Sequence, residues 1–301
     1  MSEHRHLVST AQLDRSWVEG HLFPLCDRLR QAPPDPVLHG RAVYCLFYEP
    51  SFVTRTSFER ATELLGGRAY HTEDATQFFP ISTPNYVDNV TNMLASLHMD
   101  LVVLRTSEPG AVERAAEADA LPIINGGSLD DHPTQALADL YTLRRELGGV
   151  DGVHLAVVGR LEHRNVSALL RGLAMFRGVR VTLLPMSGQL DPEVADYCQE
   201  RDVTVTTAQG PEALAEADAI YLNGPRTSAH ARLLKSRGAL DLRIDADFMA
   251  RLKPHCVIMD PMQRSGDFEI AVADGRLAFY RQAENALILR MALLAHLLEA
   301  L

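Results

Sequence analysis

Residues 49–59 read EPSFVTRTSFE and join two patterns that together predict a parallel α/β fold. The apolar run 42–48 before them is typical of a buried parallel strand. Segment 58–65 after them predicts a helix that ends at Gly66-Gly67. Hydroxyl side chains at such a turn favour an anion-binding site, because the N-terminus of a helix carries partial positive charge. Simple helix capping by Ser51 and Thr54 is the alternative interpretation.

The same alternation of apolar runs and helical patterns continues along the whole chain. Strands are predicted at residues 42–48, 101–104, 121–125, 154–158, 179–184, 203–206, 219–222 and 257–259. Helices are predicted near residues 57–65, 110–117, 134–147 and 286–301. This order predicts an α/β protein with two doubly wound parallel-sheet domains. The glycine-rich segment 148–152 is the predicted boundary between these two domains.

Composition excludes several classes of partner. The 301 residues are 47% hydrophobic and carry a net charge of −10, with acidic and basic residues interspersed. The absence of a basic stripe argues against nucleic acid. No apolar run approaches the ~20 residues of a membrane helix, and no secretory leader pattern opens the chain. The four scattered cysteines suggest neither disulfides nor a metal site, so we expect a cytoplasmic protein without metal or cofactor.

The segment SFVTR at residues 51–55 resembles the phosphate-binding motif of the aspartate/ornithine carbamoyltransferase family, Ser-Thr-Arg-Thr-Arg. The resemblance implies that Ser51, Thr54 and Arg55 bind the anion. The family's first Arg, which grips the phosphate of carbamoyl phosphate, is replaced by Val53. The likeness covers nearly the whole chain and is closer to the aspartate-type catalytic chain.

Two further motifs carry the catalytic part of the resemblance. HPTQ at residues 132–135 matches the family's signature, which implies that His132 polarises the carbamoyl carbonyl and that Gln135 holds the carbamoyl nitrogen. A lone His at a helix start is otherwise more often structural. Arg105 ends a buried strand, where a side chain points into the crevice in which such folds bind ligands. The family has an Arg there for the carbonyl and phosphate oxygens.

The family completes its anion site with a Ser and a cation from a loop of a neighbouring subunit. The matching segment 78–90 contains Ser82, but no Lys or Arg occurs between Arg68 and Arg105. Together with Val53, two phosphate-binding cations are therefore missing. Their loss would weaken binding of a phosphate dianion by roughly 10²–10⁴-fold. The shared site implies a homotrimer, and a further partner subunit stays open.

The second half resembles the family's amino-acid-binding domain. In segment 157–167, VVGRLEHRNVS, either Arg164 or Asn165 takes the substrate-carboxylate position. Arg226 matches an Arg for the substrate side chain. Met262 and Arg264 lie in DPMQR, which resembles the family's His-Pro-Leu-Pro-Arg. The resemblance implies domains 1–149 and 150–285, with helix 286–301 returning to the first domain.

Three functional hypotheses follow for this diverged site. The first is a transferase that carbamoylates an unusual amino-acid-like amine. The second is a repurposed enzyme of specialised metabolism, whose displacement or cyclisation expels phosphate or sulfate. A monoanionic sulfate needs fewer cations, which suits Val53. The third is a non-catalytic paralogue, against which the retained Arg105, His132 and Gln135 argue. The expected ligand is a small amino-acid-like molecule with a phosphate- or sulfate-like group.

Overall fold

The computed structural model describes residues 5–31, 35–77, 86–224, 242–261 and 268–300. The chain divides into two compact units. Unit 1 comprises Met1–Ala138 and Glu284–Leu301, and unit 2 comprises Asp139–Ala283. The division falls inside two helices, α6 (Pro133–Leu147) and α11 (Phe279–Leu297). The domain limits that we expected, at residues 149/150 and 285/286, stay predictions.

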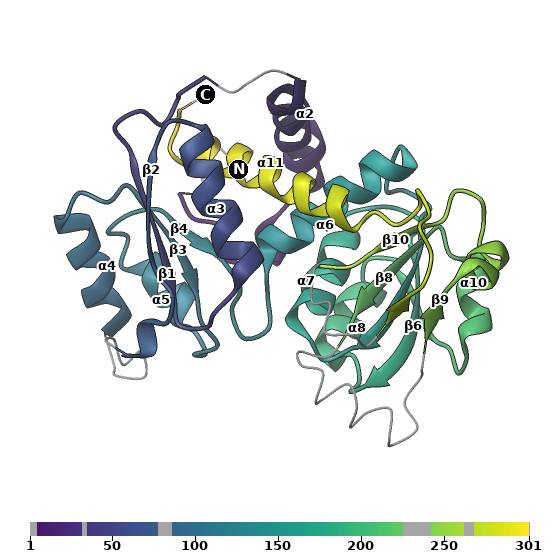
Figure 1. The fold of residues 1–301 in the computed structure, drawn as a ribbon. Coiled ribbons are helices and arrows are strands. Elements are labelled where there is room, and N and C mark those ends of the chain that lie inside the picture. Colours follow the sequence, from purple (N-terminus) through teal and green to yellow (C-terminus); the bar gives the residue numbers. More distant parts are fainter. Residues whose placement is uncertain (1–4, 32–34, 78–85, 225–241, 262–267, 301) are drawn as a thin grey trace. The chain divides into compact units, whose positions relative to one another are not determined.

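Unit 1 contains a sheet of four parallel strands in the order β2-β1-β3-β4 (Figure 1). The chain runs outward from β1 to β2 and then crosses back to form β3 and β4 on the other side of β1. Every residue of the central strand β3 is buried. The strands are β1 (Ala42–Phe47), β2 (Arg68–Thr72), β3 (Leu101–Arg105) and β4 (Ile123–Asn125).

The helices of unit 1 pack on the sheet through apolar positions that recur at helical spacing. Val87, Val90 and Leu94 of α4 share one hydrophobic cluster with Val112 of α5 and with β3 residue Val102. The helical elements are η1 (Thr10–Gln12), α1 (Arg15–Trp17), η2 (Val18–Leu22), α2 (Phe23–Gln31), α3 (Phe52–Leu64), η3 (Ala75–Gln77), α4 (Tyr86–Ser96) and α5 (Ala111–Glu117).

Helix α3 begins five residues earlier than its predicted start at residue 57. Its buried positions are Thr54, Phe58, Ala61 and Thr62, which lie on one face of a helix. The motif residues 53–55 are thus in the first helical turn rather than in a loop. Ser51 occupies the N-cap position, but its side chain makes no capping hydrogen bond. The alternative interpretation, in which Ser51 caps this helix through its side chain, is therefore wrong.

Helix α11 packs on unit 1, as the resemblance implied. Its fully buried Arg290 donates a hydrogen bond to Ser57 of α3, and Arg30 of α2 donates one to Asn285. Figure 1 shows α11 running beside α2 and α3. The helix starts at Phe279, seven residues before the predicted start, because Phe279 and Gln282 are buried on unit 2 and extend the pattern.

Unit 2 contains a five-stranded parallel sheet in the order β10-β8-β5-β6-β7. A two-stranded sheet pairs β11 with β9. The strands are β5 (His154–Arg160), β6 (Arg180–Ser187), β7 (Thr204–Thr207), β8 (Ala219–Asn223), β9 (Arg243–Ile244), β10 (Val257–Met259) and β11 (Glu269–Ile270). The helices are α7 (Arg164–Leu173), α8 (Pro192–Gln199), η4 (Pro211–Glu216) and α10 (Ala246–Arg251). Two doubly wound parallel-sheet units confirm the predicted fold class.

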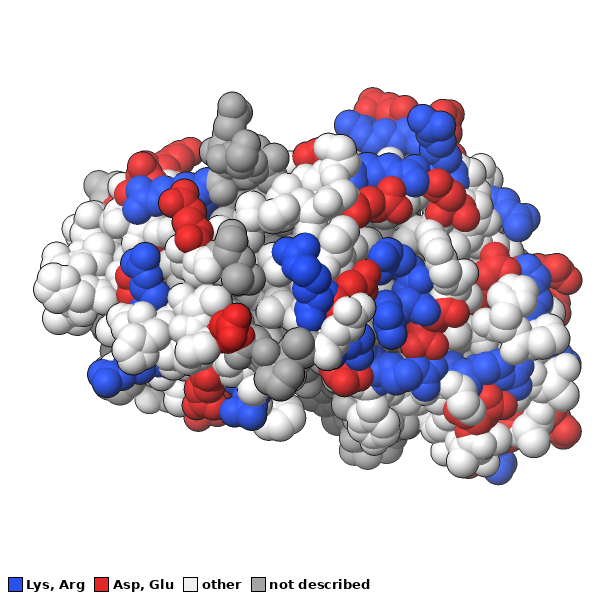
Figure 2. Space-filling model, turned by 90° about the horizontal axis from the view of Figure 1, so that it is seen from above, with Lys and Arg blue, Asp and Glu red and all other residues white. Residues whose placement is uncertain are grey.

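The surface agrees with the charge pattern of the sequence. Figure 2 shows acidic and basic side chains interspersed over the face that it presents. In the described part of the chain, no helix is both long and apolar enough to cross a membrane.

Gly159, at the end of β5, is the position where we expect the strictest backbone requirement in unit 2. It has a φ of +128°, and a Cβ atom there would lie 2.1 Å from the carbonyl oxygen of Asn223. We predict that Gly159→Ala lowers the free energy of unfolding by roughly 2–4 kcal/mol, since strain and a backbone overlap combine. Urea denaturation measures the loss. Gly149→Ala, which has open space around it, is the matched control. Equal midpoints for the two variants would contradict the expectation.

Candidate active site

The predicted catalytic residues of unit 1 lie at the carboxyl ends of neighbouring parallel strands. Arg105 is the last residue of β3, and it pairs in register with Phe47 at the end of β1. The N–H of Tyr48 donates to the carbonyl of Arg105 over 2.9 Å and continues that pairing. The strand order reverses between β1 and β3, which is where open parallel sheets bind ligands. Residues that follow β1 and β3 therefore share one ligand-binding position.

Arg105 is held in this position while most of its side chain is buried. Its side chain is 9% exposed, and Nη1 donates to the carbonyl oxygen of Gly126 over 3.0 Å. Nη2 lies 4.0 Å from a carboxylate oxygen of Glu49, the residue that begins the motif after β1. The other carboxylate oxygen of Glu49 accepts from the hydroxyl of Ser107. The guanidinium is thus oriented by a carbonyl and a carboxylate, and an anionic ligand would compete with Glu49 for it.

Gly127 brings Arg105 and His132 together. A Cβ atom at Gly127 would lie 2.5 Å from Nη1 of Arg105 and 3.4 Å from Cδ2 of His132. The guanidinium and the imidazole thus both lie within 3.4 Å of one point. Gly127 also has a φ of +120°, which an L side chain rarely adopts. A glycine is therefore required here on two grounds, and it leaves two polar groups converging on one small space.

A buried carboxylate fixes the loop that carries His132. One oxygen of Asp131 accepts from the hydroxyl of Thr10 and from the N–H of His132, over 2.6 Å and 2.7 Å. The other accepts from the N–H of Thr10 and the hydroxyl of Ser9, over 2.7 Å and 2.9 Å. The N-terminal segment reaches this point because Leu7 pairs with β4 at Ile124. Asp131 thus ties the first residues of the chain to the His132 loop.

Gln135 lies in the first turn of α6 and is 7% exposed. Its N–H donates to the carbonyl of His132 over 2.9 Å, so its position relative to the imidazole is set by the helix start. Thr134 is fully buried, and its hydroxyl lies 3.4 Å from Nδ1 of His132. His132 and Gln135 are therefore placed together by contacts at the start of α6, and Arg105 is placed by Gly126 and Glu49.

The first turn of α3 holds the predicted anion-binding residues. The first N–H groups of an α-helix have no carbonyl acceptor within the helix, which makes this turn a donor site. Thr54 is buried and Val53 is half-buried. Arg55 lies 3.6 Å from a carboxylate oxygen of Glu59 and 3.4 Å from one of Glu73. The charge of Arg55 is therefore shared with two carboxylates.

In unit 2, Arg164 and Asn165 begin α7, directly after β5. Both are 5% exposed, and the N–H of Asn165 donates to Nδ1 of His163 over 3.3 Å. The strand order of this sheet reverses between β5 and β8. The amide of Asn223, at the end of β8, donates to the carbonyl of Arg160 over 2.7 Å. The loop with Arg164 and Asn165 thus lies at the ligand-binding position of the second sheet.

Family models match both units. The carbamoyl-P binding domain of aspartate/ornithine carbamoyltransferase matches residues 5–145, and the Asp/Orn binding domain matches residues 151–297. The chain belongs to the aspartate/ornithine carbamoyltransferase family. The recognition made from the motifs is confirmed.

Relatives of this family cover most of the chain. The aspartate carbamoyltransferase catalytic subunit of Cellvibrio japonicus is 31% identical over 98% of this chain and 92% of its own length. The Multifunctional protein CAD of Squalus acanthias is 33% identical over 98% of this chain, which spans 13% of that protein. Among solved structures, aspartate transcarbamoylase from Trypanosoma cruzi in complex with N-(phosphonacetyl)-L-aspartic acid is 28% identical, with a TM-score of 0.85 over 96% of this chain and 94% of that chain.

Four predicted site residues of this carbamoyltransferase-family chain, Ser82, Arg226, Met262 and Arg264, lie outside the described residues. Their assignments stay predictions. In the described part of the chain, no group of three or more His, Cys, Asp or Glu side chains could hold a metal ion.

A polar network of unit 2 went unnoticed in the sequence. Asp139, fully buried, accepts from the hydroxyl of Tyr221 over 2.9 Å and from the amide of Gln282 over 2.7 Å. Gln282 in turn accepts from the N–H of Asp260 over 2.8 Å. Burial, followed by the charge of Asp139, raises the pKa of Tyr221 well above its ordinary value, so the phenol stays a donor. The sequence signal for this network is Asp139 itself, which follows Gln135 of the HPTQ motif by four residues, one helical turn.

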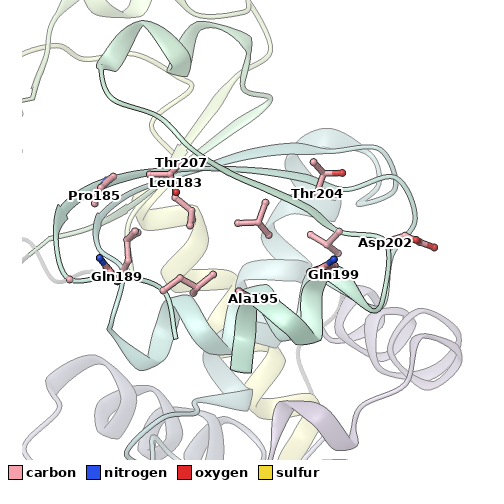
Figure 3. A pocket seen from close by; sticks show the side chains of 13 residues that line it. Leu183, Pro185, Gln189, Ala195, Gln199, Asp202, Thr204 and Thr207 are labelled. Atoms are coloured by element: carbon pink, nitrogen blue, oxygen red, sulfur yellow. The ribbon is translucent and has the colours of Figure 1, made fainter. Parts of the chain in front are cut away.

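A cavity of about 940 Å³ in unit 2 lies apart from the predicted site residues. It opens between α8 and the strands β6 and β7 (Figure 3). Leu183, Val203 and Val205 supply its apolar lining, and Gln189 and Gln199 lie at its margin. No predicted site residue lines it. The volume of this cavity therefore does not indicate where the candidate active site lies.

The Asp131 network generates a test that needs no ligand. Asp131→Asn replaces one acceptor oxygen by an NH₂ group. Each carboxylate oxygen accepts a backbone N–H, from Thr10 or His132, so either amide orientation opposes a donor to a donor. We expect a loss of roughly 1–3 kcal/mol in the free energy of unfolding, measured by urea denaturation. Asp130→Asn, at an exposed neighbour, is the control. An unchanged Asp131→Asn midpoint would refute the role.

Proposed function

We propose that this chain transfers the carbamoyl group of carbamoyl phosphate to the amino group of aspartate. The observation that carries the proposal is the convergence of Arg105 and His132 on one point beside Gly127, at the carboxyl edge of the unit 1 sheet. The match to the carbamoyl-P binding domain covers most of unit 1, and the match to the Asp/Orn binding domain covers most of unit 2.

The proposed reaction requires positioned hydrogen-bond donors rather than a nucleophilic side chain. The amine nitrogen forms a bond to the carbamoyl carbon, the bond from that carbon to the phosphate oxygen breaks, and phosphate leaves with the electron pair. The amine gives up a proton, which phosphate can accept. Negative charge grows on the carbamoyl oxygen as the bond to nitrogen forms. Arg105 and His132 would donate to that oxygen, which lowers the barrier because their donors are already oriented. Gln135 would hold the carbamoyl nitrogen.

The anion site of the proposal is the first turn of α3, with Ser51, Thr54 and Arg55. Helix N–H groups and hydroxyls supply donors, but Val53 supplies no charge at the second helical position. Ser82 of a neighbouring subunit would add a hydroxyl, so the proposal includes a homotrimer. Since two cations are missing, we expect weak binding of carbamoyl phosphate rather than loss of the reaction.

Aspartate is the proposed amine on three grounds. The Cellvibrio japonicus relative is an aspartate carbamoyltransferase catalytic subunit, and the Trypanosoma cruzi structure is an aspartate transcarbamoylase in complex with N-(phosphonacetyl)-L-aspartic acid. The segment around Arg226 resembles the aspartate type, and an ornithine-type Ser-Met-Gly loop is absent from the sequence. Arg164 or Asn165, Arg226, Met262 and Arg264 would contact the amino acid.

The four cysteines are free and buried, which agrees with the proposed cytoplasmic location.

We predict that the chain forms carbamoyl aspartate from carbamoyl phosphate and aspartate, as measured by colorimetric detection of the ureido product. Ornithine and other amino acids form the comparison panel. His132→Ala should lower kcat by about 10²–10³-fold, since one oxyanion donor is lost. Product from another amine but not from aspartate would move the proposal to that amine. No ureido product from any amine would refute it and favour the displacement that expels phosphate or sulfate.

Val53→Arg tests whether the anion site is a weakened carbamoyl phosphate site. Adding one charge-assisted contact should lower the KM for carbamoyl phosphate by about 10–100-fold. Phe52→Arg adds the same charge at the neighbouring, 78% exposed position and should leave that KM nearly unchanged. Steady-state kinetics with saturating aspartate gives both values. A collapse of activity in Val53→Arg alone would show that the site was reshaped for another group.

A further inference from the structure

A fully buried cation lies behind the first turn of α3. Arg290, on the C-terminal helix α11, has no exposed surface and is the largest fully buried side chain in the described part of the chain. Its guanidinium carbon lies 5.1 Å from the centre of the Phe58 ring, and Nη1 donates to the hydroxyl oxygen of Ser57 over 2.5 Å. Both contacts are to α3. The C-terminal helix therefore places a permanent positive charge against the helix that begins the anion site.

Ser57 passes this interaction to the first turn. Its hydroxyl donates to the carbonyl oxygens of Val53 and Thr54, over 2.5 Å and 3.0 Å. The carbonyl of Val53 belongs to the same peptide unit as the N–H of Thr54. That N–H is among the helix-terminal donors that lack a carbonyl acceptor within the helix. A continuous chain of groups thus runs from the guanidinium of Arg290 through Ser57 to a donor of the anion site.

Such a chain strengthens its last donor. A hydroxyl that accepts from a guanidinium becomes a better donor, and a carbonyl that accepts from it polarises the N–H of its own peptide unit. The hydroxyl also pins the carbonyls of the first turn, so that the helix N–H groups keep their direction. Arg290 is linked through Ser57 to the carbonyl of Val53, the position from which the family's motif Arg is missing.

Burying the Arg290 guanidinium costs free energy of desolvation, which a side chain with only a packing role need not incur. Removing a guanidinium from water requires compensation from several interactions, and an apolar side chain of similar volume often stabilises a protein as well. A fully buried guanidinium that is hydrogen-bonded to the anion-site helix therefore suggests a role in that site.

We propose that Arg290 is a positioning residue for the anion site and acts through Ser57 on the first turn of α3. The proposal rests on the proposed function, because it takes that turn as the phosphate site. It assigns to the C-terminal helix a share of anion affinity that the direct contacts at Val53 no longer supply.

Titration calorimetry with inorganic phosphate, the leaving group of the proposed reaction, provides the test. Ser57→Ala should weaken phosphate binding by roughly 5–30-fold, less than the loss of a direct hydrogen bond to a charged group, because Ser57 acts on the phosphate only through the first turn of α3. Ser57→Thr keeps a hydroxyl and should restore most of the affinity. Thr62→Val is the matched control, because the Thr62 hydroxyl donates to the carbonyl of Phe58 in the same way, but farther along α3. It should leave the affinity unchanged.

Kinetic and thermal measurements separate positioning from general stability. Ser57→Ala should raise the KM for carbamoyl phosphate with little change in kcat or in the KM for aspartate. A purely structural role would lower the midpoint of thermal unfolding without this selective change. Arg290→Lys keeps the charge and should bind phosphate more tightly than Arg290→Met. If Arg290→Met does not fold, the Ser57 variants decide the question.

The possible failures are distinguishable. Unchanged phosphate affinity in Ser57→Ala, with a wild type that binds phosphate, would overturn the role of Arg290 and Ser57 and leave the proposed function standing. Equal losses in Ser57→Ala and Thr62→Val would also overturn it, since the effect would then belong to the helix as a whole. A wild type that binds no phosphate overturns this inference. Whether the proposed function then stands is decided by the separate assay for carbamoyl aspartate.

Discussion

The parallel pairing of β1 with β3 is the constraint on which the candidate site depends. It brings the ends of two strands, 58 residues apart in the sequence at Phe47 and Arg105, into one register. The α3 turn follows one strand, and the Arg105 guanidinium ends the other. Parallel strands need crossover connections, so consecutive strands of this sheet can meet only at the same carboxyl edge. The pairing of β3 with β4 then adds Gly127 and His132 to that edge. Catalytic proximity here is a consequence of topology.

Electrostatics decides how this edge can be used. The protein is acidic overall, and both arginines of the candidate site lie near carboxylates, Arg105 near Glu49 and Arg55 near Glu59 and Glu73. An anion bound at this edge would compete with these carboxylates. The N-terminus of α3 is a further source of positive potential, and buried Arg290 is hydrogen-bonded to the same helix through Ser57. Charge that is held by the fold is available to a ligand without rearrangement.

Much of this arrangement could be predicted from sequence, and what could not has identifiable causes. Each predicted strand overlaps a strand of the structure. Most of these strands are buried, continuous apolar runs, whereas edge strand β7 is largely exposed and was recognised by its β-branched residues. Edge strand β2 is polar and mostly exposed, so it gave no such signal. The start of α3 was placed too late because the motif was interpreted as a loop, although Thr54 and Phe58 already show helical spacing.

The residues that escaped prediction act through distant partners. Asp131 acts on Ser9 and Thr10, about 120 positions away, and Arg290 acts on Ser57, 233 positions away. Gly127 matters through the space that it leaves open. A motif names the residues that touch a ligand, whereas these residues are defined by folded contacts. Their roles can therefore be recognised only in the folded structure.

For the proposed reaction, a cation that contacts the phosphate is not equivalent to a cation that acts on it through neutral groups. A guanidinium at Val53 would contact a phosphate that is already charged in the ground state, so its absence should raise KM. Charge also grows on the phosphate as it leaves, so part of the loss would fall on kcat. Arg105 and His132 would instead meet charge that grows on the carbamoyl oxygen only as the bond to nitrogen forms. On the proposed function, the chain keeps Arg105 and His132 for the carbamoyl oxygen, and Arg290 supplies through Ser57 part of the binding that a charge at Val53 would give. A family member so altered would be slow at low substrate concentration yet competent at saturation. The proposed divergence would then lie mainly in affinity for the donor substrate.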